Sequence, residues 1–297
     1  MDPAGGSLVA DSTAILSKEM RLVLVAAALA GTVMAAPSIL VHGHRGARAM
    51  RPENTIPAFE YAIGVGADVL EMDLAVTKDN VLVISHDPHL NAEICKGPGG
   101  SNVIHELTLV QLRQWDCGSL RNPRFPTQQP VPRTRVPTLD EVLDLAPRGR
   151  FEYNIETKIF PEHPELTPSP EVFAQLLLNA IRKHKLHQRV IVQSFDFRTL
   201  HAMKKLDPTI RLSALYENGG EDFVSIARRA GAGIVSPEYH MVTPQKVQDA
   251  HAAGLQVVPW TANDPADWQG LADARVDAII SDNPAALIAW LKEKGLR

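Results

Sequence analysis

Five polar residues in one short stretch have the types and the spacing of a site for chemistry on a phosphate ester. The stretch is HGHRGARAMRPENTIPAFEYAIGVGADVLEMDLAVTKDNVLVISHD, residues 42–87, and the five are His44, Arg45, Glu71, Asp73 and His86. Histidines can accept and donate protons near neutral pH. Glu71 and Asp73 alternate in an apparent strand, so both point to one face. Convergent carboxylates repel each other unless a cation or a shared proton lies between them, and the pattern therefore indicates metal-assisted chemistry.

The elements that must position these residues alternate along the chain. Nine apolar runs have the character of strands: 39–43, 68–74, 81–86, 151–157, 189–195, 210–216, 233–237, 256–261 and 277–281. Helical patterns lie between most of them, as at 170–185, 244–254 and 284–294. This alternation predicts βαβ units and a parallel sheet, either closed into a barrel or open and doubly wound. A barrel of eight strands has no place for a ninth, and we expect 277–281 to lie outside it, leading into the final helix.

One segment interrupts the alternation. Residues 88–136 are rich in proline and glycine and have little sustained periodicity. Loops of this length are uncommon in compact domains unless they are functional, so we predict an insertion over one mouth of a barrel. The chain's two cysteines, Cys95 and Cys117, both lie in this segment. In an exported protein they would be able to form a disulfide, and two free thiols are the alternative.

Further polar residues follow other candidate strands. Barrel enzymes place catalytic residues at the carboxyl ends of their strands, and Glu156 and Lys158 end the run 151–157. With Glu71 and Asp73, Glu156 completes an all-oxygen set that suits Ca²⁺ or Mg²⁺ better than zinc. Salt bridges to nearby arginine or lysine are the alternative use of these carboxylates.

The cationic and aromatic residues predict a substrate pocket. Arg45 can bind a phosphate through two parallel hydrogen bonds, and Lys158 adds a point charge. Trp260 lies at the end of the run 256–261 and would line the wall of this pocket, with ordinary packing as the alternative. Glu53 either approaches the metal or holds Arg45 in place, and we expect Asn54–Thr55 to start the following helix.

The motifs in 42–87 resemble the signature of the glycerophosphodiester phosphodiesterase family: H-R-G, P-E-N-T, G-A-D-x-x-E-x-D and H-D, in that order. Further matches are PTLDEVL at 137–143, I-E-x-K at 155–158, PWTAND around Trp260 and IISDNP at 279–284. The resemblance spans residues 39–290. It implies a single TIM (β/α)8 barrel with a loop-rich insertion, residues 88–136, over its C-terminal mouth. It also assigns the three carboxylates to the metal.

The expected reaction converts a glycerophosphodiester and water into glycerol 3-phosphate and an alcohol. His44 and His86 would be the acid–base pair, and one divalent cation, Ca²⁺ or Mg²⁺, the cofactor. A phospholipase D-type enzyme acting on lysophospholipids or sphingomyelin is the nearest alternative, and a barrel that only binds a phosphorylated ligand is a third. After His86 and Asp87 the chain lacks the Arg-Thr-Thr run of many relatives, which leaves the identity of the alcohol open.

Composition and the N-terminal segment bear on partners and location. The formal net charge of −4 favours neither nucleic acid nor an anionic membrane, so we expect a small-molecule substrate, no nucleic acid and no stable membrane insertion. Residues 20–36 have a basic start, an apolar stretch and small residues at the end, as in a signal peptide. We therefore divide the chain into an N-terminal extension with a signal peptide, 1–36, and a barrel domain, 37–297, in a periplasmic or secreted protein. A buried N-terminal helix in a cytoplasmic protein is the alternative.

Overall fold

The computed structural model describes residues 38–297. The predicted extension and signal peptide, 1–36, lie outside the described residues, so the proposed division of the chain stays a prediction. Within 38–297 no helix is both long enough and apolar enough to cross a membrane.

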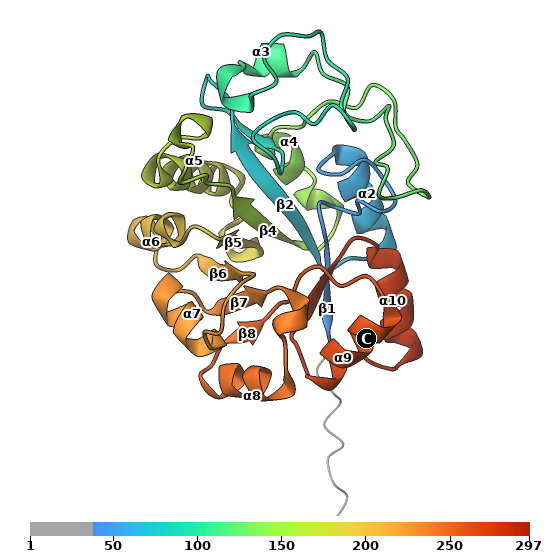
Figure 1. The fold of residues 1–297 in the computed structure, drawn as a ribbon, viewed down its shortest axis with the longest axis vertical. Coiled ribbons are helices and arrows are strands. Elements are labelled where there is room, and N and C mark those ends of the chain that lie inside the picture. The colour runs from blue at the N-terminus through green and yellow to red at the C-terminus, as the bar shows by residue number, and fades with distance from the viewer. Residues whose placement is uncertain (1–37) are drawn as a thin grey trace, which may run out of the picture. The chain divides into compact units, whose positions relative to one another are not determined.

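Eight parallel strands form a nearly closed barrel, with helices around its outer face (Figure 1). Their order is β8 (Gln256–Val257), β7 (Ile234–Pro237), β6 (Arg211–Tyr216), β5 (Val190–Ser194), β4 (Glu152–Thr157), β2 (Val69–Val76), β1 (Leu40–Gly43) and β9 (Ala278–Ser281). Three backbone hydrogen bonds join the two ends of this series. The amides of Asp277, Ile280 and Ala262 donate to the carbonyls of Val257, Pro259 and Ile280, at 3.0, 3.0 and 3.1 Å. The TIM-barrel prediction is therefore confirmed, and the open-sheet alternative is wrong.

The expectation for residues 277–281 is wrong. They form β9, which pairs with β1 from Leu40↔Ala278 to Gly43↔Ser281 and supplies the eighth barrel strand. The strand outside the barrel is β3 (Leu82–Ile84), which pairs antiparallel with the last residues of β2. A short apolar run has the same composition in both positions, so hydrophobicity alone could not distinguish them.

The helices cover the barrel with their apolar faces. They are α2 (Ile56–Val65), α4 (Leu139–Leu143), α5 (Pro170–His184), α6 (Phe197–Leu206), α7 (Phe223–Ala230), α8 (Pro244–Ala252), α9 (Pro265–Asp273) and α10 (Pro284–Glu293). In α5, Phe173, Leu177 and Ile181 recur every four residues and are fully buried against the strands. The helices predicted at 170–185, 244–254 and 284–294 are thus confirmed as α5, α8 and α10.

The insertion has a small core of its own beyond the end of β2, where Figure 1 shows the short helix α3 (Leu109–Leu112) at the outer edge. Leu112, Trp115 and Val136 are buried in this core. Cys95 and Cys117 are joined in a disulfide beside it. The two ends of the insertion meet, because the Ile84 amide donates to the Pro137 carbonyl at 2.9 Å.

Candidate active site

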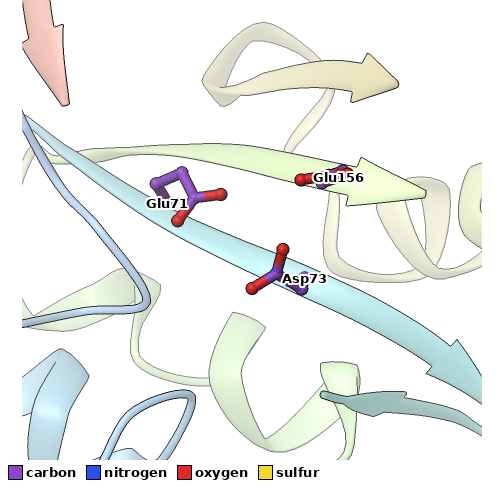
Figure 2. A group of neighbouring side chains, drawn as sticks. All are labelled: Glu71, Asp73 and Glu156. Carbon is purple, nitrogen blue, oxygen red and sulfur yellow. The ribbon is translucent and has the colours of Figure 1, made fainter. Parts of the chain in front are cut away.

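Three buried carboxylates meet at the carboxyl end of the barrel. Glu71 and Asp73 lie on β2 and Glu156 on the neighbouring strand β4, and Figure 2 shows all three turned toward one another. The register pairs Asp73 with Glu156 across the two strands. One oxygen from each residue can be chosen so that all three lie within 4.8 Å of one another. The predicted cluster is confirmed as a group that could hold a metal ion.

Two cations pair with this cluster. Lys158 Nζ lies 2.7 Å from Glu156 Oε1 and 3.2 Å from Asp73 Oδ1. Arg45 Nε lies 3.3 Å from Asp73 Oδ2, and its Nη1 lies 2.5 Å from Glu53 Oε1. The salt bridges considered as an alternative are therefore present. They do not balance the charge, because four carboxylates (Glu53 and the three clustered acids) face two cations, and full ionisation would leave two negative charges.

This excess charge is reflected in the pKa values. Burial, together with the negative charge of Asp73, raises the pKa of Glu71 well above its usual value. Burial also raises the pKa of Glu156, although Lys158 opposes the shift. At Asp73 burial works against the charge, but Lys158, His86 and Arg45 outweigh it and hold the pKa well below its usual value. A hard divalent cation among all-oxygen donors would supply the missing positive charge, so these residues fit such an ion.

His44 is held by a buried carboxylate outside the cluster, that of Asp282. Its Nδ1 lies 2.5 Å from Oδ1 of Asp282, which follows β9, and its Nε2 lies 3.9 Å from Glu71 Oε2. Burial disfavours the charge on Asp282, but His44 and Arg48 outweigh it and hold the pKa of Asp282 below its usual range. An ionised carboxylate can only accept, so His44 Nδ1 carries the hydrogen and Nε2 faces the carboxylate cluster without one. Burial and the nearby Arg48 lower the pKa of His44 to about 4, which keeps it neutral at pH 7.

His86 approaches the same cavity from a different direction. It follows β3, which returns antiparallel beside β2, and the Ser85 amide donates to the Asp73 carbonyl at 3.0 Å. The side chain of His86 is 37% exposed, and its Nδ1 lies 2.7 Å from Asp87 Oδ1. The two histidines therefore differ, one buried beside the carboxylates and one at the open mouth.

The P-E-N-T segment acts on the cluster through side chains. Glu53 pairs with Arg45, which matches the second of its two predicted positions. Thr55 occupies the N-cap position of α2, but its side chain caps no amide and instead donates to the Pro52 carbonyl. The expectation that Asn54 helps to start α2 is wrong, because its buried Nδ2 donates to Asp73 Oδ2 at 2.9 Å.

These groups line one cavity of about 370 Å³. It contains all the residues predicted for the site except Glu53, which lies behind Arg45. Trp260 lines its wall, with its ring edge-on to Phe195 at 5.5 Å and its Nε1 donating to the Ser236 carbonyl at 2.8 Å. Arg124, from the insertion, reaches the same cavity.

Sequence reasoning missed Asp282 and gave no independent signal for Gln193. Gln193 Nε2 donates to Glu71 Oε1 at 2.9 Å, and its Oε1 accepts from Asn154 Nδ2 at 2.9 Å. The other oxygen of Glu71 accepts from the Arg45 amide at 2.8 Å. Both oxygens of this carboxylate are therefore oriented by fixed donors.

A nearly closed parallel barrel with acids, cations and histidines at its C-terminal mouth has the architecture of a TIM-barrel enzyme whose site suits chemistry on phosphate esters. Comparison with known proteins gives the family. The model of the glycerophosphoryl diester phosphodiesterase family matches residues 44–286. The chain belongs to this family and is a phosphodiester hydrolase.

Individual relatives agree with this placement. A glycerophosphodiester phosphodiesterase of Caldanaerobacter subterraneus is 32% identical over 256 residues, covering 86% of this chain and 99% of that protein. A glycerophosphodiester phosphodiesterase of Bacillus subtilis is 31% identical over 278 residues, covering 88% of this chain and 89% of that protein. The structure of an Oleispira antarctica phosphodiesterase, solved with its product sn-glycerol-3-phosphate, covers 86% of this chain and 97% of that one, with a TM-score of 0.73 and 23% identity. At 23% identity, this structural comparison shows that the two chains share a fold.

Proposed function

We propose that this chain hydrolyses glycerophosphodiesters to glycerol 3-phosphate and an alcohol, by acid–base catalysis between His44 and His86 beside one divalent cation. The observation that carries the proposal is the buried carboxylate cluster, which has more carboxylates than paired cations, next to a histidine whose bare nitrogen faces it. The names of the two relatives that are 31% and 32% identical support the substrate class.

Glu71, Asp73 and Glu156 would hold the cation, Ca²⁺ or Mg²⁺. When bound, it would polarise a phosphoryl oxygen and offset the charge that develops during displacement. Gln193 and the Arg45 amide fix the two oxygens of Glu71, which keeps this ligand in one orientation.

The different surroundings of the histidines give them different tasks. His44 is neutral and keeps a bare Nε2, so it takes the proton from the attacking oxygen. His86 lies at the open mouth, where it gives a proton to the oxygen of the departing alcohol. Asp282 positions His44 and stabilises the imidazolium that forms.

Arg45 and Lys158 bind the phosphate. Both line the cavity and both already lie against carboxylates of the cluster, so the substrate's phosphate oxygens would share these cations with the protein. Trp260 and Phe195 form the apolar wall against which the carbon skeleton of the substrate packs.

We further propose that the barrel domain, 37–297, works outside the cytoplasm after removal of a signal peptide at 20–36. The disulfide between Cys95 and Cys117 supports this location, because such bonds persist in oxidising compartments.

The test uses purified protein and glycerophosphoethanolamine, with and without a chelator. His44→Ala and His86→Ala should each fold normally, bind metal and lose at least about 10²-fold in kcat. His163→Ala, an exposed histidine away from the cavity, is the matched control. Full turnover in a metal-free sample, or near-normal turnover in either variant, would contradict the corresponding part of the proposal.

A further inference from the structure

A segment of the insertion, residues 122–129, is fixed to the loop that carries His44 and Arg45. Gln128, whose exposed fraction is 1%, donates from Nε2 to the Arg48 carbonyl at 2.6 Å and to the Arg51 carbonyl at 3.1 Å. The Gln129 amide donates to the Met50 carbonyl at 3.0 Å. We call residues 122–129 the strap. A buried amide side chain with two acceptors makes its position well defined.

The strap also contacts the phosphate-binding group. Asn122 is buried, and its Nδ2 donates to Glu53 Oε2 at 3.1 Å, while Glu53 pairs with Arg45. The Oδ1 of Asn122 accepts from the Arg124 amide at 3.0 Å. The backbone of Arg124 is thereby anchored through one buried side chain to the residues that would hold the phosphate.

Arg124 lines the active-site cavity with its cationic side chain free. The other three cations of that cavity are paired, Arg45 with Glu53, Arg48 with Asp282 and Lys158 with Glu156. Within residues 38–297 Arg124 has no carboxylate within ion-pair distance. A guanidinium in this position remains available to a ligand.

Arg124 reaches the cavity from the insertion, the segment that begins directly after His86 and Asp87. His86, the proposed donor to the departing alcohol, lines the same cavity as Arg124. Glu217, another carboxylate that lines the cavity, follows β6, which is separated from β2 by β4 and β5 in the barrel. Arg124 and Glu217 therefore come from different parts of the mouth.

We propose that Arg124 is a specificity-determining residue that binds an anionic group on the alcohol half of the substrate. The preferred substrates of the enzyme are then glycerophosphodiesters whose alcohol carries a phosphate or a comparable anion. This inference rests on the proposed function. Arg124 contacts a part of the substrate that does not react, so it distinguishes among alcohols and leaves the chemistry of the phosphodiester unchanged.

The experiment compares three diesters that share the glycerophosphoryl half: glycerophosphoglycerol, the same compound with a terminal phosphate, and glycerophosphoethanolamine. Arg124→Gln should lower kcat/KM for the phosphate-bearing alcohol by about tenfold or more, the effect of losing a hydrogen bond to a charged group. It should change kcat/KM for the neutral alcohol by less than about twofold, well below that effect. Arg135→Gln, at an exposed arginine of the insertion outside the strap, controls for net charge.

Glu217→Gln separates local recognition from the general field of the mouth. If the field alone matters, this variant should improve the phosphate-bearing substrate by as much as Arg124→Gln harms it, and high salt should cancel both effects. Equal losses on all three diesters in Arg124→Gln, or the same loss in Arg135→Gln, would overturn the inference. Inactivity of the parent protein on every diester would instead overturn the proposed function, and the inference with it.

Discussion

Replacing Asp282 by asparagine tests the central link in the proposed mechanism. Both oxygens of Asp282 accept from donors only. Oδ1 accepts from His44 Nδ1 and from Arg48 Nε at 2.6 Å, and Oδ2 accepts from Asn263 Nδ2 at 2.9 Å and Arg48 Nη2 at 3.2 Å. The amide of Asn263 cannot turn freely, because its Oδ1 accepts from the Asp282 amide and from Ser281 Oγ. An asparagine in place of Asp282 must therefore direct its NH₂ group at donors on one side or the other.

The two orientations of the introduced side-chain amide differ in cost. With NH₂ in the place of Oδ2, it faces two donors, from Arg48 and Asn263, and His44 keeps its hydrogen on Nδ1. With NH₂ in the place of Oδ1, it faces only the Arg48 donor, because His44 Nδ1 can become an acceptor by moving its hydrogen to Nε2. An unmatched buried polar group costs about 1–3 kcal/mol, so the second arrangement is favoured by one such mismatch. The active tautomer then falls to between about one sixth and about 1/160 of the molecules.

We therefore expect Asp282→Asn to lower kcat by about 6- to 160-fold, with a smaller change in KM. The loss cannot exceed that of His44→Ala if Asp282 acts through this histidine. The assay is steady-state hydrolysis of a glycerophosphodiester with an unactivated alcohol, together with the metal content of each variant.

The double variant gives the decisive comparison. In a His44→Ala background, Asp282→Asn should cost almost nothing further, because there is no tautomer left to control. Full additivity of the two losses would refute the reasoning and assign Asp282 an independent structural role. A loss of bound metal in Asp282→Asn alone would refute it in a different way.

Three further predictions concern the metal, pH and the disulfide. Removing the cation should abolish activity, and Gln193→Leu, which deprives Glu71 Oε1 of its donor, should weaken metal binding by about 10- to 100-fold; unchanged affinity by titration calorimetry would count against this support. Burial lowers the pKa of His42 to about 3 and that of His44 to about 4, so below pH 6.5 the unfolded chain binds protons that the folded chain does not. Each histidine should therefore lower the free energy of unfolding by about 1.4 kcal/mol per pH unit as pH decreases from 6.5 toward these values, while the raised pKa values of Glu71 and Glu156 contribute with the opposite sign. Urea titrations that compare His42→Asn with the parent should isolate the contribution of His42 as a difference between the two pH slopes. The disulfide closes a loop with a sequence separation of 22, so Cys95→Ser/Cys117→Ser should lose about 3 kcal/mol relative to the oxidised protein, and equal denaturation midpoints would contradict that value.

The local features of the site could be predicted from sequence, because strand geometry alone determines them. Glu71 and Asp73 are two residues apart in a buried strand, so they had to share a face. The ends of β4 and β8 likewise placed Glu156, Lys158 and Trp260 at the barrel mouth. Predicting the positions of these residues required no knowledge of which strands are neighbours.

Long-range contacts were not predictable in this way. Asp282 is 238 residues from His44 in the chain, and before Asn-Pro it has the pattern of an ordinary strand-to-helix junction. Asn54 has the composition of a helix cap, yet the fold turns it toward Asp73. Neither role follows from neighbouring residues, since each depends on how separate strands are placed around the barrel.

The direction of β3 was accessible and was missed. Only residues 77–81 connect β2 to β3, which is too short for the crossover that a parallel pair requires. The length of this turn indicates a hairpin, and a hairpin in this place would have left 277–281 as the eighth barrel strand. Connection length carried the information that hydrophobicity lacked.

The meeting of the insertion's two ends has a consequence for how such an enzyme diversifies. Because the Ile84 amide bonds the Pro137 carbonyl, residues 88–136 leave the barrel and return to it at one point. A segment with coincident ends and its own core can be lengthened, shortened or exchanged at little entropic cost to the scaffold. The strap is also bonded to Arg48, Arg51 and Glu53, so a graft onto a related barrel would have to include this loop. We expect such a graft to transfer selectivity for the alcohol while the phosphodiester chemistry stays with the recipient.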